Sequence, residues 1–132
     1  MNFFFDNCVS RNLVVALRAV CGPRQTIVHL TDQFSSSVKD AEWLSVLGKE
    51  VDLFVVSGDP RITRGKVERV AWKESELTVF FFGDGFSSLT IYEQAAFLFR
   101  RWPDILVTAR SSQKGVGYIV HVRGKEFDQI YA

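Results

Sequence analysis

The chain has 132 residues and a formal net charge of +1, with 47% hydrophobic and 23% charged residues. This balance is typical of a globular domain with a sizeable core, and no overall charge marks a nucleic-acid or membrane partner. Cys8 and Cys21 show no metal-ligand spacing, which argues against a thiolate site or a disulfide framework. We expect a single domain over residues 1–132 in a reducing cytoplasm, without a secretory signal or a membrane span.

Apolar runs alternate with helical patterns along the chain. Strands are predicted over residues 2–6, 26–31, 52–57, 77–82 and 118–122. Helices are predicted over residues 9–21, 38–47, 63–74 and from Thr90 to Trp102. Pro103 ends the last one, and residues 104–110 form either a further helical turn or a short separate helix. This alternation produces parallel strands joined by right-handed crossovers. We predict a three-layer α/β/α sandwich with a mostly parallel sheet of four to five strands, followed by a polar tail at 125–132 that is either at the edge of the sheet or frayed.

Local signals suggest where the helices begin and which side they bury. Either Asn7 or Ser10 caps the first helix, and the capping box at 37–40 starts the second near residue 38. In the third helix, Val67 and Val70 are predicted to face the core, with basic residues on the outer side.

Four of the apolar runs end in an aspartate, namely Asp6, Asp32, Asp59 and Asp84. The carboxyl ends of parallel strands meet at one edge of a sheet, which is where open α/β sheets bind ligands. The pattern therefore predicts a row of acids along one rim, suited to holding a cation.

Each acid also has a structural alternative. Asp6 fits a metal ligand and a helix N-cap equally well. Asp59 precedes Pro60, as turn residues often do, but the nearby Arg61 favours a ligand beside a phosphate-binding cation.

Helix capping accounts for Asp40 and Glu42 when they are considered alone, because both lie in the first turn of the second helix. Asp40 and Glu42 become candidate metal ligands only in combination with the acids at the carboxyl ends of the strands. Asp84 and Asp32 fit turns better, since Asp84 precedes a glycine and Asp32 precedes a serine-rich loop.

A basic segment follows the third strand. Arg61, Arg64 and Lys66 are candidate contacts to an RNA backbone, with a solvated helix face as the alternative. His29 and His121 fall on predicted strands among apolar neighbours, and we assign them no role.

Carboxylates without thiol or imidazole partners favour Mg²⁺ or Mn²⁺, which leave coordination positions open for a phosphodiester.

Three sequence blocks point to a family. FFFDN begins at Phe3, KDAEWL spans 39–44 and FVVSGDPRI spans 54–62. Their order and spacing resemble the PIN-like ribonuclease superfamily, and in particular the toxin-type minimal proteins of prokaryotic toxin–antitoxin pairs. The resemblance covers about residues 1–100 and implies an Mg²⁺- or Mn²⁺-dependent endoribonuclease with an antitoxin partner.

The resemblance also implies residue roles. Asp6, Asp40 and Asp59 would be the catalytic metal ligands, Glu42 a fourth acid or a partner of a ligand, and Ser57 the family's small hydroxyl residue. Full-length PIN domains carry a further acid between the first strand and the position of Asp40, and that insertion is absent here. The metal site is therefore short of one acid.

Two alternatives remain open. One is a catalytically inactive PIN-like binding module. The other is a receiver-like, phospho-accepting regulator in which Asp59 accepts the phosphoryl group, although Asn7 stands where an acidic pair is expected and no Lys-Pro follows the final strand. The expected partners are RNA and an antitoxin, and a homodimer stays open. Glu68 is a candidate for the missing acid that we do not adopt.

Overall fold

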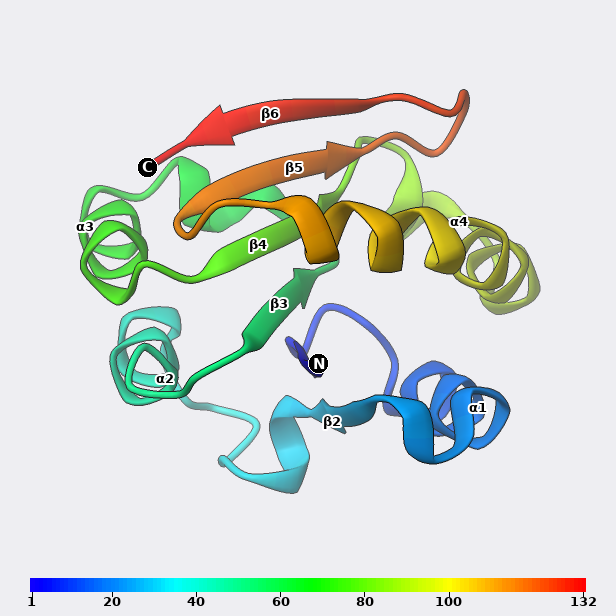
Figure 1. The fold of residues 1–132 in the computed structure, drawn as a ribbon, viewed down its shortest axis with the longest axis horizontal. Coiled ribbons are helices and arrows are strands. Elements are labelled where there is room, and N and C mark those ends of the chain that lie inside the picture. The colour runs from blue at the N-terminus through cyan, green and yellow to red at the C-terminus, as the bar shows by residue number, and fades with distance from the viewer.

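A computed structural model describes all 132 residues, and it contains one sheet between two helical layers (Figure 1). The strands are β1 (Asn2–Phe5), β2 (Thr26–His29), β3 (Leu53–Ser57), β4 (Thr78–Phe82), β5 (Val116–Val120) and β6 (Phe127–Tyr131). Their order in the sheet is β2-β1-β3-β4-β5-β6, with β1 to β5 parallel and β6 antiparallel to β5. The predicted three-layer, mostly parallel fold is confirmed, with a sheet of six strands.

Four helices cover the two faces of the sheet: α1 (Arg11–Cys21), α2 (Asp40–Leu47), α3 (Lys66–Ser75) and α4 (Ile91–Ser111). Helices α1 and α4 lie on one face, and α2 and α3 lie on the other (Figure 1). Successive side chains of a strand point to opposite faces. Phe3 and Phe5 therefore pack against α1 and α4, whereas Phe4 packs against α2 and α3.

The central strands are buried on both faces, which explains their uninterrupted apolar sequences. All five residues of β4 are buried, and each face has an indole against the sheet. Trp102 of α4 lies 4.7 Å from Phe3 between ring centroids, and Trp43 of α2 lies 5.2 Å from Phe4. The aromatic rings of β1 thus connect both helical layers to the sheet.

The C-terminal tail forms the sixth strand at the edge of the sheet, so of the two predicted alternatives the frayed tail is wrong. Strand β6 pairs with β5 from Phe127↔Val120 to Tyr131↔Val116. The ring of Phe127 also lies 4.8 Å from the guanidinium of Arg101 in α4. Tertiary contacts therefore hold a stretch whose own pattern is too polar to be recognised as a strand.

Two helix boundaries differ from prediction. Helix α4 continues through Pro103 to Ser111, because Ile105 and Ala109 extend its buried face along the sheet beyond the proline. Helix α2 begins at Asp40, and no side chain caps it. The predicted capping box is wrong.

The third predicted helix divides into a 3₁₀ turn at Pro60–Thr63 and α3. Val67 and Val70, predicted to face the core, are 65% and 50% exposed. Trp72 is the buried residue of α3, and its indole N–H donates to the carbonyl of Leu77. One large ring anchors this helix instead of a regular apolar stripe.

None of the helices has both the length and the apolar composition that crossing a bilayer requires.

Candidate active site

The candidate site lies where the sheet changes its direction of growth. Strand β2 is added on one side of β1, whereas β3, β4 and β5 follow on the other. Such a switch point leaves a crevice at the carboxyl edge of an open α/β sheet, where ligands bind. Asp6 directly follows β1, and Asp59 lies two residues after β3. Both acids therefore follow the carboxyl ends of the two strands that flank the switch point.

The carboxylate of Asp6 links the ends of two neighbouring strands. It is 5% exposed and accepts hydrogen bonds from the hydroxyl of Ser57, the amide of Gly58 at 3.2 Å and the amide of Cys8 at 3.0 Å. Helix α1 is capped instead by Ser10. The alternative in which Asp6 serves as an N-cap is therefore wrong, and its carboxylate belongs to the edge of the sheet.

Burial raises the pKa of Asp6 to about 6, although the hydrogen bonds from Ser57, Gly58 and Cys8 oppose the shift. The negative charge of Asp40 raises this pKa further, which places the two carboxylates within electrostatic reach. No basic side chain pairs with Asp6. A cation close to the Asp6 carboxylate would stabilise its ionised form.

Arg61 lies between several groups of the site. Its Nε is 3.0 Å from Oδ2 of Asp59, and its backbone amide donates to Oδ1 of the same residue at 2.9 Å. Its Nη2 lies 3.0 Å from the sulfur of Cys8. The pKa of Arg61 is raised, first by this contact with Cys8 and then by the charges of Asp59 and Asp40. A guanidinium therefore lies within the electrostatic field of the acids.

Asp40 and Glu42 behave differently although both lie in the first turn of α2. Asp40 is partly buried, and its Oδ1 accepts a hydrogen bond of 3.0 Å from the indole of Trp43. Glu42 is exposed and forms no hydrogen bond or ion pair. Residues two positions apart on a helix do not face each other. Of these two acids, only Asp40 contributes to the raised pKa of Asp6.

The chemistry of the donors fits a hard cation, because Asp6, Asp40 and Asp59 offer only carboxylate oxygens. Their present arrangement is not a formed metal centre, since no three His, Cys, Asp or Glu side chains are grouped closely enough to hold an ion. Asp59 is paired with Arg61, and Asp40 with Trp43. An ion bound by Asp59 would compete with Arg61 for this carboxylate.

The sequence model of a family described as PIN like domain matches residues 1–84. The chain belongs to the PIN-like domain family. PIN-like domains are commonly nucleases, so membership indicates a nuclease-type function in general. No curated protein and no solved structure matches the chain. The matched range includes Asp6, Asp40 and Asp59, and leaves α4, β5 and β6 outside it.

The other predicted residues of this PIN-like domain surround the site or lie away from it. Arg64 and Lys66 are exposed beyond the turn that holds Arg61. Asp32 lies in the turn after β2, where it forms ion pairs of 2.9 Å with Arg11 and Arg18. The role of Asp32 in the structure is to hold this turn against α1.

Neither His29 nor Cys8 entered the predicted site, and the structure distinguishes them. His29 is 2% exposed, and its two ring nitrogens contact the carbonyl of Val9 and the hydroxyl of Thr31. It is a satisfied core residue of the PIN-like domain. Cys8 contacts Arg61 beside the acids, with its pKa raised to about 11, mainly by burial. Its position two residues after Asp6 was the only signal in the sequence.

Proposed function

We propose that this PIN-like chain is an endoribonuclease that depends on Mg²⁺ or Mn²⁺ and hydrolyses RNA phosphodiester bonds. One observation carries the proposal: Asp6 and Asp59 follow the two strands that flank the switch point of the sheet, and the charge of Asp40, from a third segment, raises the pKa of Asp6. Family membership supports the nuclease class. The cation and the RNA substrate are parts of the proposal that rest on the chemistry of these groups.

The residues of the site have separable roles in this proposal. Asp6, Asp40 and Asp59 would hold the ion, which supplies an activated water and stabilises the leaving oxygen when bound. Ser57 holds the Asp6 carboxylate in place through its hydroxyl. Once released from Asp59, Arg61 would contact the scissile phosphate, because a guanidinium binds phosphate oxygens in a bidentate manner.

The proposal is tested by incubating the purified chain with end-labelled RNA and Mn²⁺, with and without a chelator. Cleavage is expected only with the ion, and both Asp6→Asn and Asp59→Asn should abolish it. Asp52→Asn is the matched control, because Asp52 lies at the opposite end of β3 with a φ of 57°, which asparagine tolerates. RNA that stays intact, or cleavage that survives both site substitutions, would overturn the proposal.

We further propose that the nuclease is the toxin of a toxin–antitoxin system and is held inactive by a protein antitoxin. The resemblance of the blocks around Asp6, Asp40 and Asp59 to toxin-type proteins supports this. Expression of the chain should arrest growth, Asp59→Asn should relieve the arrest, and a small neighbouring open reading frame should neutralise it. Growth that is unaffected by an active nuclease would contradict the toxin role alone.

An inactive binding module is the second candidate, and the Asp59–Arg61 ion pair favours it because it supplies a cation from the chain itself. Such a module should show no Mn²⁺-dependent rise in melting temperature.

A receiver-like regulator is the third candidate, since the order β2-β1-β3-β4-β5 is also that of doubly wound regulators. Labelling of Asp59 by acetyl phosphate would identify it.

A further inference from the structure

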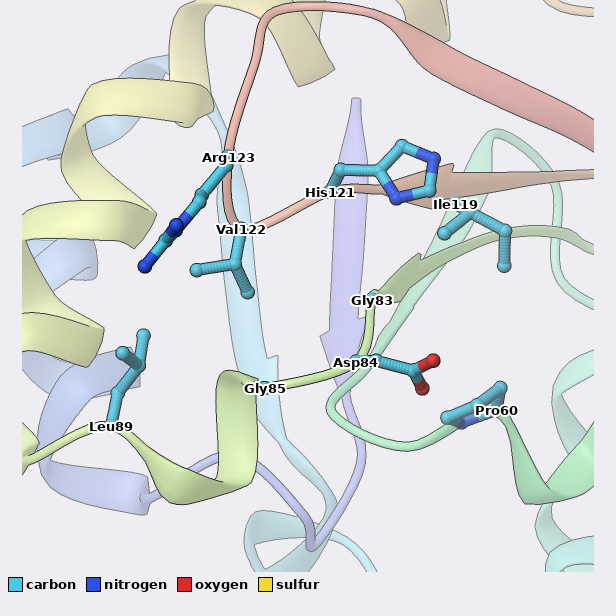
Figure 2. A pocket seen from close by; sticks show the side chains of 9 residues that line it. All are labelled: Pro60, Gly83, Asp84, Gly85, Leu89, Ile119, His121, Val122 and Arg123. Atoms are coloured by element: carbon cyan, nitrogen blue, oxygen red, sulfur yellow. The ribbon is translucent and has the colours of Figure 1, made fainter.

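A hollow lies at the carboxyl edge of the sheet, over the ends of β4 and β5 (Figure 2). Its volume is about 640 Å³, within the range of sites for small ligands. The lining residues are Pro60, Gly83–Gly85, Leu89, Ile119 and His121–Arg123. Pro60 belongs to the turn that presents Asp59 and Arg61, so the hollow adjoins the acidic site. Most of its wall lies outside the residues matched by the family.

The imidazole of His121 has one nitrogen engaged and one available. Its Nε2 lies 2.8 Å from the Oδ2 of Asp128, an oxygen that only accepts. Nε2 therefore carries the proton when the ring is neutral, and Nδ1 is left as an acceptor. A Cβ on Gly83 would lie 3.4 Å from this Nδ1, so the free nitrogen lies over the glycine floor of the hollow.

The loop that carries Arg123 is fixed from below by a buried arginine. Arg101 is 2% exposed and donates to the carbonyls of His121 at 3.1 Å, Gly124 at 2.8 Å and Lys125 at 2.9 Å. Arg123 itself is exposed and pairs with no acidic side chain. A cation without a partner is thus held on an ordered loop at the rim of the hollow.

The polar groups stand at opposite sides of an apolar wall. Figure 2 shows the guanidinium of Arg123 turned toward Leu89 and the carboxylate of Asp84 turned toward Pro60. Val122 lies between these two sides. A ligand that spans the hollow would meet a cation at one end, an acceptor at the other and apolar surface between them.

We infer that this hollow binds one nucleotide of the RNA strand next to the cleavage site. Arg123 contacts its phosphate, Asp84 accepts from an N–H of its base, and Nδ1 of His121 accepts from its ribose hydroxyl. The aliphatic wall of Leu89, Ile119 and Val122 contacts the face of the base, since ligand sites combine apolar lining with a few polar groups that fix orientation. That the bound nucleotide belongs to an RNA strand rests on the proposed nuclease function. That the hollow binds a nucleotide rests on the hollow alone.

The test is a titration of the isotope-labelled chain with each of the four 5′-ribonucleoside monophosphates, followed by amide NMR in the presence of a chelator. The chelator removes divalent ions, so nucleotide binding is measured without RNA cleavage. Amide shifts are expected at Gly83–Gly85 and His121–Gly124, and Arg123→Gln should weaken binding roughly tenfold, the scale of one charge-assisted contact. Arg69→Gln, at an exposed position of α3, is the matched control and should bind as the unmodified chain does.

Absence of binding at the hollow, or equal affinity in Arg123→Gln and the unmodified chain, would overturn the nucleotide site. Deoxynucleotides should bind more weakly than ribonucleotides, and equal binding would overturn the role given to His121. The two proposals fail separately. Nucleotide binding without RNA cleavage would end the nuclease proposal, and cleavage without nucleotide binding at the hollow would end this inference.

Discussion

The hydroxyl of Ser57, at the end of β3, donates a hydrogen bond to the carboxylate of Asp6, which follows β1. The same oxygen lies 3.3 Å from the backbone amide of Asp59, which donates to it. One small side chain therefore ties together the two strand ends that flank the switch point. The position of the buried acid relative to Asp59 depends on this contact.

The first prediction concerns the pH dependence of stability. The pKa of Asp6 is raised from 3.8 to about 6 in the folded chain, chiefly by burial. Between these values the folded state holds a proton that the unfolded state has released, so the free energy of unfolding falls as pH rises through this window. A shift of about two pKa units corresponds to about 3 kcal/mol, lost by about pH 7.

Asp6→Asn should remove this slope, because the amide has no proton to release. Denaturant unfolding with a chelator, between about pH 4.5 and about pH 7.5, measures the difference. Asp52→Asn should retain the slope of the unmodified chain. An unchanged slope in Asp6→Asn would show that another group causes it.

The layered fold was predictable because burial on both faces leaves a clear mark in the sequence. Phe3–Phe5 and Val79–Phe82 are apolar without interruption, which is typical of central parallel strands. Strand β6 lacks that mark. Phe127 and Ile130 are three positions apart, so they lie on opposite faces of the sheet and give no alternating apolar pattern. Pairing with β5 is what makes this stretch a strand.

The candidate site was predictable only as far as the strand ends determine it. Asp6 and Asp59 lie at one edge because parallel strands end together, and this needs no knowledge of loops. The ion pair between Arg61 and Asp59 depends on the 3₁₀ turn that follows β3. The Asp59-Pro60 pair indicated a turn there, but not that Arg61 would pair with Asp59. The hollow beside His121 combines segments nearly forty positions apart, from Gly83 onward, and was not foreseen.

The second prediction concerns competition between Arg61 and a metal ion. Arg61→Gln should increase the affinity for Mn²⁺, because Asp59 would no longer be paired with an internal cation. The pair is largely exposed, so an increase of roughly two- to fivefold is expected, as for a surface ion pair of below about 1 kcal/mol. The rise in melting temperature with Mn²⁺ concentration measures it. Arg64→Gln, on the same basic segment, should leave the affinity unchanged, and lower affinity in Arg61→Gln would contradict the competition.

The third prediction concerns acid stability away from the site. The pKa of Asp32 is lowered to about 2, first by the amide of His29 and also by Arg11 and Arg18. Its contribution to stability is complete above the unfolded value near 4 and is lost as pH falls toward 2. Asp32→Asn should cost roughly 1 kcal/mol at neutral pH, after allowing for solvent screening, and nothing near about pH 2.

Denaturant unfolding across this acid range tests the prediction for Asp32. Arg24→Gln is a suitable control, since Arg24 is exposed in the turn after α1 and forms no ion pair with Asp32. It should leave the profile unchanged. A stability loss in Asp32→Asn that persists unchanged at the acid end would mean that shape, and not charge, is responsible.

The fourth prediction concerns Arg101, the buried arginine that fixes the loop carrying Arg123. Arg101→Met should lower the free energy of unfolding by about 3 kcal/mol, because three buried or partly buried carbonyls lose their donor. The cation–π contact with Phe127 is lost as well. Amide hydrogen exchange over 121–127 should become faster, since the loop and the start of β6 lose their attachment to α4.

Arg100→Met is the matched control, since Arg100 is exposed and donates one hydrogen bond of 3.2 Å to the carbonyl of Val122. It should cost less than about 1 kcal/mol. Equal losses for the two substitutions, or exchange at 121–127 that stays as slow as in the unmodified chain, would show that β5 alone holds the loop. The orientation of Arg123 at the rim would then not depend on Arg101.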